Sequence, residues 1–243
     1  MSTVDQDEIA HFSRLSAHWW DWYGPLHALH KFNPLRVAYI RDRAAAHFGR
    51  DATRADSLAG LRILDIGCGG GILCEPLTRL GAAVTGIDPA PSNIAVAQHH
   101  AAQEGLAIDY RSTTAEALAA TGGVFDMVLA MEVLEHVADV GLFIRLAAGL
   151  VKPGGLVFFA TFNRTLKSFV LGIVAAEYIL RWVPRGTHQW EKFITPEELN
   201  AELRRNGLRL LDQTGTVYRF LKHRWRLSSN MDVNYMLMAD KAA

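Results

Sequence analysis

The chain has 243 residues, half of them hydrophobic, which is enough for one α/β domain with a full core. Its 25 basic residues balance 25 acidic ones, so the formal net charge is zero and a surface that binds nucleic acid through a strong basic excess is excluded. We expect no signal peptide, because residues 2–8 are polar and acidic, and no transmembrane helix, because no run of 18 apolar residues occurs.

Strands and helices alternate through the middle of the chain. Apolar runs predict strands over residues 62–66, 83–87, 107–111, 125–131 and 156–161. Helices are predicted over residues 72–80, 91–104 and 141–150, and the last is stopped by Lys152, Pro153, Gly154 and Gly155. Short, fully apolar strands joined by helices are typical of a parallel sheet covered on both faces. The pattern therefore predicts a Rossmann-like α/β fold.

In the last third of the chain the regular alternation of strands and helices ends. Thr195 and Pro196 start a helix, with the threonine as its cap. Two strands are then predicted over residues 208–218 and 231–239, separated by the basic segment 222–226. Two late strands without an intervening helix indicate an antiparallel pair that closes the sheet edge. A nicotinamide-binding Rossmann domain does not usually end in this way.

Three segments fall outside this predicted core, namely residues 8–48, 163–190 and 217–230. We expect all three to gather above the carboxyl ends of the strands, where open α/β sheets bind ligands. The prediction is a single domain over residues 1–243 with these segments as its lid.

A glycine-rich loop follows the first predicted strand. Its glycines let the backbone turn tightly and approach a ligand, and the helix after it favours a negative group. The spacing of Gly67, Gly69 and Gly71 leaves Ile72 where a dinucleotide fingerprint has its third glycine or alanine. Asp65 would repel a pyrophosphate, but it suits the cationic end of an amino-acid cofactor. The loop therefore favours an adenosine-type cofactor of that kind over a dinucleotide.

Acidic residues also follow the next two strands. Asp88 comes 23 residues after Asp65, where a carboxylate can accept hydrogen bonds from ribose hydroxyls; an exposed loop aspartate is the alternative. Glu116, just after the third strand, is a candidate for the edge that contacts an adenine ring, with an ordinary surface residue as the alternative.

The fourth predicted strand ends in Met131, which is followed by Glu132, Glu135 and His136. If the chain turns helical there, the last three fall at i, i+3 and i+4 on one face. Two carboxylates and an imidazole so arranged hold a divalent metal or act as an acid–base set. The alternative is that they only shape the pocket.

Motifs outside the predicted core connect the chain with a known family. They are Trp-Trp-Asp at 19–21, Asn-Pro-Leu-Arg at 33–36, Ala-Glu-Tyr-Ile-Leu at 176–180, Pro-Arg-Gly-Thr-His at 184–188 and Asp-Val-Asn-Tyr-Met at 232–236. With the loop at 64–71 and the segment 151–155, the chain resembles the ubiquinone-biosynthesis O-methyltransferases from about Ile9 to Lys241. These are class I methyltransferases that use S-adenosylmethionine.

The resemblance implies a seven-stranded class I sheet with helices on both faces and a C-terminal antiparallel strand pair. It also implies two methylations at phenolic oxygens, one on a polyprenyl catechol and one on a demethylubiquinol. Arg36, Gly67, Asp88 and Met131 match the family's cofactor contacts, with Arg36 clamping the cofactor carboxylate. Some members carry magnesium on the residues that match Glu132, Glu135 and His136, which makes Mg²⁺ a second candidate cofactor.

Two mechanisms fit these residues. A free phenol has a pKa of about 10, so its proton must be removed or neutralised before the oxygen attacks the methyl group. Either a metal on Glu132, Glu135 and His136 lowers that pKa, or His136 acts alone as general base.

The segment 166–185 is rich in large apolar residues with basic residues beside them, a composition that suits a helix lying at a membrane surface. A lid helix packed on its own core is the alternative. We expect a cytoplasmic protein peripherally associated with the inner membrane, and the two cysteines, Cys68 and Cys74, suit a reducing compartment. The expected partners are the prenylated phenol or quinol substrate and a complex of ubiquinone-biosynthesis enzymes.

Three rival functions are open at this point. One is a methyltransferase that acts on another small phenol or on a quinone ring carbon. Another is a cofactor-binding sensor without catalysis, which the Glu132-to-His136 set argues against. A nicotinamide dehydrogenase is disfavoured by Asp65, Ile72 and the late strand pair.

Overall fold

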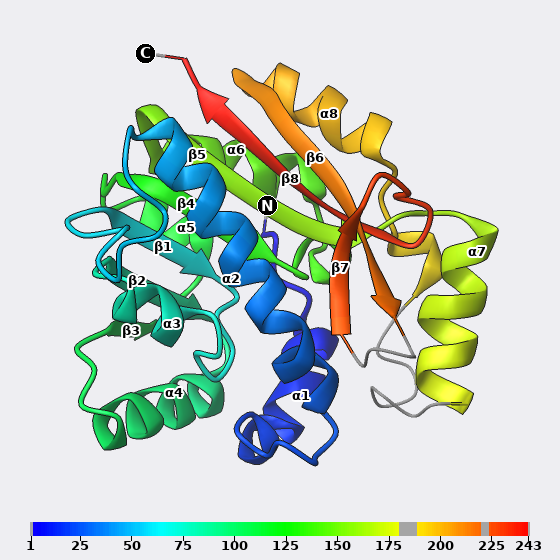
Figure 1. Ribbon diagram of the computed structural model, residues 1–243. Coiled ribbons are helices and arrows are strands. Elements are labelled where there is room, and N and C mark those ends of the chain that lie inside the picture. Colours follow the sequence, from blue (N-terminus) through cyan, green and yellow to red (C-terminus); the bar gives the residue numbers. More distant parts are fainter. Residues whose placement is uncertain (1, 180–188, 220–223, 243) are drawn as a thin grey trace.

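The computed structural model describes residues 2–179, 189–219 and 224–242 (Figure 1). In these residues one sheet of eight strands has the order β3-β2-β1-β4-β5-β8-β6-β7. The strands are β1 (Arg62–Ile66), β2 (Ala83–Asp88), β3 (Asp109–Ser112), β4 (Phe125–Met131), β5 (Val151–Phe162), β6 (Leu208–Arg219), β7 (Arg224–Ser228) and β8 (Asn234–Lys241).

The first five strands are parallel, and the late strands run against them. β8 inserts between β5 and β6 and pairs antiparallel with both. The predicted α/β sheet with its antiparallel pair is therefore confirmed, and all seven residues of β4 at its centre are buried. Because parallel strands share one orientation, the carboxyl ends of β1, β2 and β4 meet at the same edge.

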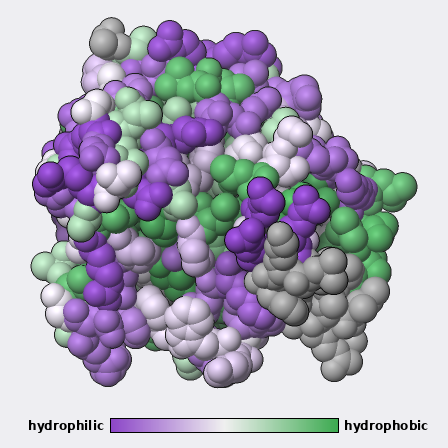
Figure 2. Space-filling model, viewed as in Figure 1, coloured by the Kyte–Doolittle hydropathy of each residue, from purple (hydrophilic) through white to green (hydrophobic). Residues whose placement is uncertain are grey.

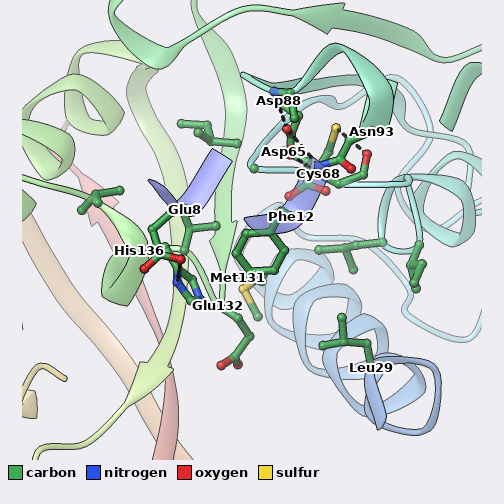
Figure 3. A pocket seen from close by; sticks show the side chains of 18 of the residues that line it. Glu8, Phe12, Leu29, Asp65, Cys68, Asp88, Asn93, Met131, Glu132 and His136 are labelled. Atoms are coloured by element: carbon green, nitrogen blue, oxygen red, sulfur yellow. Dashed lines mark hydrogen bonds and ion pairs between the residues drawn. The ribbon is translucent and has the colours of Figure 1, made fainter. Parts of the chain in front are cut away.

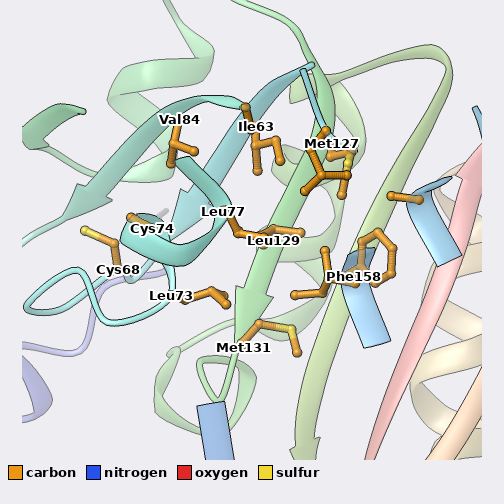
Figure 4. Close-up of a cluster of buried hydrophobic side chains, with 14 of the residues drawn as sticks. Ile63, Cys68, Leu73, Cys74, Leu77, Val84, Met127, Leu129, Met131 and Phe158 are labelled. Carbon is orange, nitrogen blue, oxygen red and sulfur yellow. The ribbon is translucent and has the colours of Figure 1, made fainter. Parts of the chain in front are cut away.

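Helices cover both faces of this sheet. On one face lie α2 (His27–His47), α3 (Cys74–Arg79) and α4 (Pro91–Gln103), packed on alternate strand residues such as Met127 and Leu129 (Figure 4). On the other face lie α5 (Ala115–Ala119), α6 (Val140–Leu150) and α8 (Pro196–Arg205), packed on Val128 and its neighbours. Alternate residues of β4 point to opposite cores because the side-chain period of a strand is two.

Local chemistry explains where these helices begin. α8 starts with a capping box, in which the Thr195 hydroxyl accepts from the Glu198 amide and the Glu198 carboxylate accepts from the Thr195 amide. The Asp139 side chain caps α6 by accepting from the Leu142 amide. The predicted cap at Thr195 is confirmed.

Two features of the sheet differ from the prediction. β5 begins at Val151, directly after α6, five residues before the predicted strand. Its pairing with β4 jumps from Val151 to Leu156, so residues 152–155, which stop the helix as predicted, form a bulge inside the strand. β7 is an additional edge strand in the segment expected to be lid, and it pairs with the end of β6.

The remaining helical elements lie outside the two cores, except that Leu134 of η2 is buried in the second one. They are α1 (Gln6–Arg14), η1 (Ser16–His18), η2 (Leu134–His136), α7 (Leu166–Ser168), η3 (Phe169–Ile179) and η4 (Trp190–Lys192). The predicted lid segment 8–48 is only partly a lid, because Tyr39, Ile40 and Ala44 of α2 are buried in the core beside the sheet. Across the described residues, no helix combines the length and apolar character needed to cross a membrane.

Candidate active site

A cavity of about 320 Å³ lies at the carboxyl ends of β1, β2 and β4. Its wall includes the glycine loop at one side and His136 at the other (Figure 3). All three segments predicted to lie above the sheet contribute to it, for example through Phe12, Leu171 and Trp225. The cavity thus joins a polar loop to an apolar, aromatic wall.

The glycine loop has the shape that its sequence predicts. Gly67, Gly69 and Gly71 all have positive φ angles, which residues with a Cβ rarely adopt. The amides of Gly67 and Cys68 both donate to the Ile87 carbonyl at the end of β2, at 2.8 and 3.0 Å. The loop is therefore tied to the neighbouring strand, and Gly67, Cys68 and Gly69 line the cavity.

Asp65 and Arg36 bring opposite charges to this wall. Asp65 is the next-to-last residue of β1 and accepts from the Cys74 thiol at 3.2 Å. Burial raises the pKa of its carboxyl to about 7, although that hydrogen bond and the Arg36 charge act in the other direction. Buried Arg36 donates to Asn33 from Nη2 at 3.1 Å, while its Nε has no hydrogen-bond partner among the described residues. A ligand with both a carboxylate and an ammonium group fits this pair.

Asp88 lies across the loop from these residues. Its Oδ2 accepts from the Gly69 amide at 3.0 Å, and its Oδ1 accepts from the Ala90 amide at 2.8 Å and from Asn93 Nδ2 at 3.2 Å. Burial raises the pKa of the Asp88 carboxyl, and the three donors oppose that shift. The carboxylate is thus oriented by its surroundings rather than exposed, which disfavours the loop-aspartate alternative.

At the other end of the cavity, His136 is held by the N-terminal helix. Its Nδ1 lies 3.1 Å from Glu8 Oε2, and the edge of the Phe12 ring packs on the imidazole with 5.1 Å between centroids. Lys192 Nζ is 3.3 Å from the other Glu8 oxygen. Burial opposes ionisation of Glu8, but the hydrogen bonds and charges of His136 and Lys192 bring the pKa of its carboxyl below the usual value. Glu8 is therefore a carboxylate at neutral pH, and Nδ1 of His136 is its donor, which leaves the basic lone pair on Nε2.

The predicted metal set is not assembled, and this corrects the expectation of one helical face. The helical turn begins only at Leu134, and Glu132 has a left-handed φ of 62°, so the i, i+3, i+4 geometry does not form. Glu132 and His136 line the cavity, but buried Glu135 does not, and its Oε2 accepts from the Thr161 hydroxyl at 2.8 Å. Burial and the Glu132 charge raise the pKa of Glu135 well above its usual value.

Glu135 is thus held by Thr161 away from the cavity that Glu132 and His136 line. No group of three His, Cys, Asp or Glu side chains suited to a metal ion is found in the described parts of the chain. The residues as arranged therefore do not fit a magnesium ion.

Of the predicted site residues, most meet at the cavity. Those that line it are Arg36, Asp65, Gly67, Gly69, Asp88, Met131, Glu132 and His136. Glu116 does not, because its Oε1 accepts from the amide and hydroxyl of Thr3, at 2.5 and 2.8 Å, while its neighbours Thr114 and Ala115 do line the cavity.

Sequence reasoning did not identify Glu8, Lys192 and Asn93 as site residues. Glu8 is 128 residues from His136 along the chain, so no local pattern could connect them. Asn93 lies near the start of α4, five residues after Asp88. This closeness to a strand end is the one feature of the sequence that could have identified Asn93 as a site residue.

Comparison with known proteins agrees with this geometry. Residues 30–213 match the model of the family described as "Methyltransferase domain". The fold resembles that of magnesium protoporphyrin IX methyltransferase from Synechocystis, solved with bound SAH, with a TM-score of 0.65, 21% identity and coverage of 96% of this chain and 95% of that one. Fold, glycine loop and family match together define a methyltransferase that uses S-adenosylmethionine.

More closely related proteins of known name identify the family within this class of methyltransferases. A protein named ubiquinone biosynthesis O-methyltransferase from Methylobacterium nodulans is 56% identical over 98% of this chain and 96% of its own length. One of the same name from Brucella anthropi is 57% identical over 100% of this chain and 98% of its own length. The chain belongs to the ubiquinone biosynthesis O-methyltransferase family.

Proposed function

We propose that the chain transfers the methyl group of S-adenosylmethionine to phenolic oxygens of polyprenyl phenol and catechol intermediates, at both O-methylation steps of ubiquinone biosynthesis. The observation that carries this proposal is the single cavity that joins the glycine loop to the Glu8–His136 pair. The names of the relatives support the pathway, and the aromatic and aliphatic wall formed by Phe162, Leu171 and Trp225 suits a prenylated ring.

The cofactor occupies the loop side of the cavity in this proposal. Arg36 binds its carboxylate through the buried guanidinium, and Asp65 binds its ammonium group. Asp88 accepts from the ribose. Met131, at the end of β4, packs beside the sulfonium end, and Thr114 and Ala115 rather than the Glu116 side chain border the adenine.

The methyl group passes in line from the sulfonium to a phenolate, so that positive and negative charges cancel in the transition state. Such a reaction is accelerated by alignment in a site that excludes water. Residues from the N-terminal segment, η3 and β7 close over the cavity and supply that enclosure.

His136 removes the phenol proton in this scheme. Glu8 accepts from Nδ1 and thereby sets the tautomer in which Nε2 takes the proton, and its negative charge stabilises the imidazolium that forms. Lys192 and Asp5, 3.0 Å apart, help to keep α1 in place above the cavity.

The direct test is a methyl-transfer assay on the purified chain with a short-chain demethylubiquinol and a prenyl catechol, compared with an unprenylated catechol. We expect both prenylated substrates to be methylated on oxygen, with a higher kcat/KM than the plain catechol. Equal kcat/KM for the plain catechol would favour a methyltransferase for another small phenol. Absence of transfer to either prenylated substrate would overturn the proposal.

The magnesium hypothesis is tested in the same assay after exhaustive EDTA treatment. We expect turnover to persist, because Glu135 does not line the cavity and Nδ1 of His136 is bonded to Glu8. Loss of turnover that added Mg²⁺ restores would show that the three predicted ligands rearrange around an ion.

We also propose that the chain contacts a membrane surface through the start of the 166–185 segment. Leu166, Phe169, Val170 and Leu171 are 41–76% exposed, and Figure 2 shows apolar side chains gathered over α7 and η3. Basic Lys167 lies among them, as in helices that lie at membrane interfaces. Residues 180–185 of the predicted segment lie outside the described residues. Such a surface would bring the cavity to a prenylated substrate within the bilayer, alone or in a complex of biosynthetic enzymes.

A further inference from the structure

Two tryptophans of the N-terminal segment lie on the glycine loop. The Trp19 ring is so close that a Cβ at Gly69 or at Gly70 would come within 2.4 Å of Trp19 atoms. The Trp20 indole donates to the Gly70 carbonyl at 2.9 Å. Trp19 instead makes its hydrogen bond to a side chain, since its Nε1 donates to Asn93 Oδ1 at 2.9 Å.

This bond determines which way the Asn93 amide faces. An indole N–H only donates, so it requires the oxygen of the amide, and the Nδ2 group must then point in the opposite direction. There Nδ2 donates to Asp88 Oδ1 at 3.2 Å. Trp19 and Asn93 are both buried, so neither group has water as a substitute partner. With the amide reversed, the Asn93 oxygen would face the Asp88 carboxylate and repel it.

The Asp88 carboxylate is in turn oriented by these donors. Oδ1 accepts two hydrogen bonds, from Ala90 and Asn93, whereas Oδ2 accepts one, from Gly69. A carboxylate oxygen has about two lone-pair sites, so Oδ2 is the oxygen with capacity for a further donor. Figure 3 shows Asn93 and Asp88 beside each other on the loop side of the cavity.

We infer that Trp19 is a positioning residue for the cofactor ribose: it fixes the Asn93 amide, which fixes Asp88 with Oδ2 presented to a ribose hydroxyl. The inference rests on the proposed binding of the ribose by Asp88. The N-terminal segment then both closes the cavity and completes the ribose contact, because Asp88 is correctly oriented only while Trp19 packs on the loop.

The test compares the binding of S-adenosylhomocysteine with that of its 2′-deoxyribosyl and 3′-deoxyribosyl analogues by titration calorimetry. We define the discrimination as the Kd of an analogue divided by the Kd of S-adenosylhomocysteine. Trp19→Phe keeps a ring over the glycine loop but removes the N–H donor. We expect the Kd of S-adenosylhomocysteine to rise about tenfold, the change that loss of one buried hydrogen bond produces. The Kd of the analogue that lacks the bound hydroxyl should change little, so the discrimination falls.

Trp20→Phe is the matched control, because its lost bond goes to Gly70 and not to Asn93. It should shift the Kd of all three ligands by one common factor. Asn93→Ala should lower the discrimination as Trp19→Phe does, and the double variant should lower it no further, since both changes break the same chain of contacts.

Asp88→Ala distinguishes a failure of the proposed ribose site from a failure of the positioning role of Trp19. If this variant keeps the discrimination, the proposed ribose site is wrong. If it loses the discrimination while Trp19→Phe retains it, the ribose site stands and the positioning role of Trp19 is overturned. If Trp19→Phe changes the Kd of all three ligands by the same factor, as expected for the Trp20→Phe control, the positioning role is also overturned and Trp19 only packs over the glycine loop.

Discussion

At the scale of single residues, the sequence could place the acid–base groups in the site but could not identify all of their interaction partners. Asp65 was identified from its place just before the glycine loop, and Asp88 and His136 from their positions after predicted strands; all three line the cavity. The surroundings of Asp65 and His136, however, include groups that lie far away in the sequence. Burial raises the pKa of Asp65 to about 7, and Glu8 arrives from the other end of the chain to hold His136.

His136→Ala should abolish methyl transfer and leave the Kd of S-adenosylhomocysteine within a few-fold of wild type. The reason is that the imidazole lies beside Glu8 and Phe12, apart from the glycine loop residues that bind the cofactor in our proposal. Steady-state turnover and titration calorimetry provide the two measurements. An unchanged kcat with the normal product would exclude His136 as the base.

Cofactor binding should release up to about half a proton at pH 7. In the ligand-free protein the Asp65 carboxyl has a pKa of about 7, so about half of it is protonated at that pH. An ammonium group brought beside it favours the charged form and lowers this pKa. The bound state then carries fewer protons, so affinity rises as pH increases through 7.

The proton count follows from calorimetry in buffers of different ionisation enthalpy. Asp65→Asn, which cannot titrate, should bind S-adenosylhomocysteine more weakly and show no release from this position. A wild-type proton count of zero between pH 6 and 8 would contradict the assignment of Asp65 to the ammonium group.

At the scale of elements, the glycine loop depends on the strand beside it as much as on its own sequence. Gly71 has a φ of +86°, and a Cβ there would lie 2.2 Å from the Tyr110 hydroxyl oxygen of β3. The pattern of glycines predicted the tight turn, but not which side chain fills the space behind it. The helix caps at Thr195 and Asp139, by contrast, depend on neighbours three residues away, so sequence sufficed to predict the first of them.

Gly71→Ala should lower the free energy of unfolding by about 2 kcal/mol or more, because it combines backbone strain with a clash against a buried ring. Gly149→Ala, on the exposed side of α6 with no atom within 4 Å of the new Cβ, is the matched control. That change should raise the free energy of unfolding by about 0.5–1 kcal/mol. Urea denaturation measures both. A smaller loss in Gly71→Ala than about 1 kcal/mol would mean that Tyr110 can move aside.

At the scale of the whole molecule, three segments far apart in sequence converge on one cavity. Trp225 of β7 packs on Phe32 of α2, with 4.9 Å between ring centroids, and both side chains line the cavity. The apolar patch at Leu166, Phe169 and Val170 lies on the outside, and the next residue along, Leu171, reaches the cavity lining. One short helical segment thus connects the surface with the candidate substrate site.

The triple change Leu166→Ser, Phe169→Ser and Val170→Ser should lower co-sedimentation with anionic liposomes at least tenfold, since each of these side chains contributes burial of roughly 1–2 kcal/mol at an interface. Leu171 stays unchanged because it lines the cavity. Leu211→Ser, an exposed leucine on β6, should leave liposome binding at the wild-type level. Equal binding of the triple variant and wild type would defeat the membrane proposal, while turnover of a short-chain substrate in solution tests that its site is intact.

The sequence by itself determined the alternation of strands and helices, the glycine loop and the acidic residues at the strand ends. These features follow from hydrophobic periodicity and from backbone preferences of glycine, which act between near neighbours. Only the tertiary structure decided which groups meet across long stretches of chain. It joined Trp19 to Asn93 over 74 residues and Glu8 to His136 over 128. It also kept the predicted metal ligands from meeting in the cavity, because the left-handed backbone at Glu132 breaks the predicted helical spacing, and Glu135, which accepts from the Thr161 hydroxyl, does not line the cavity.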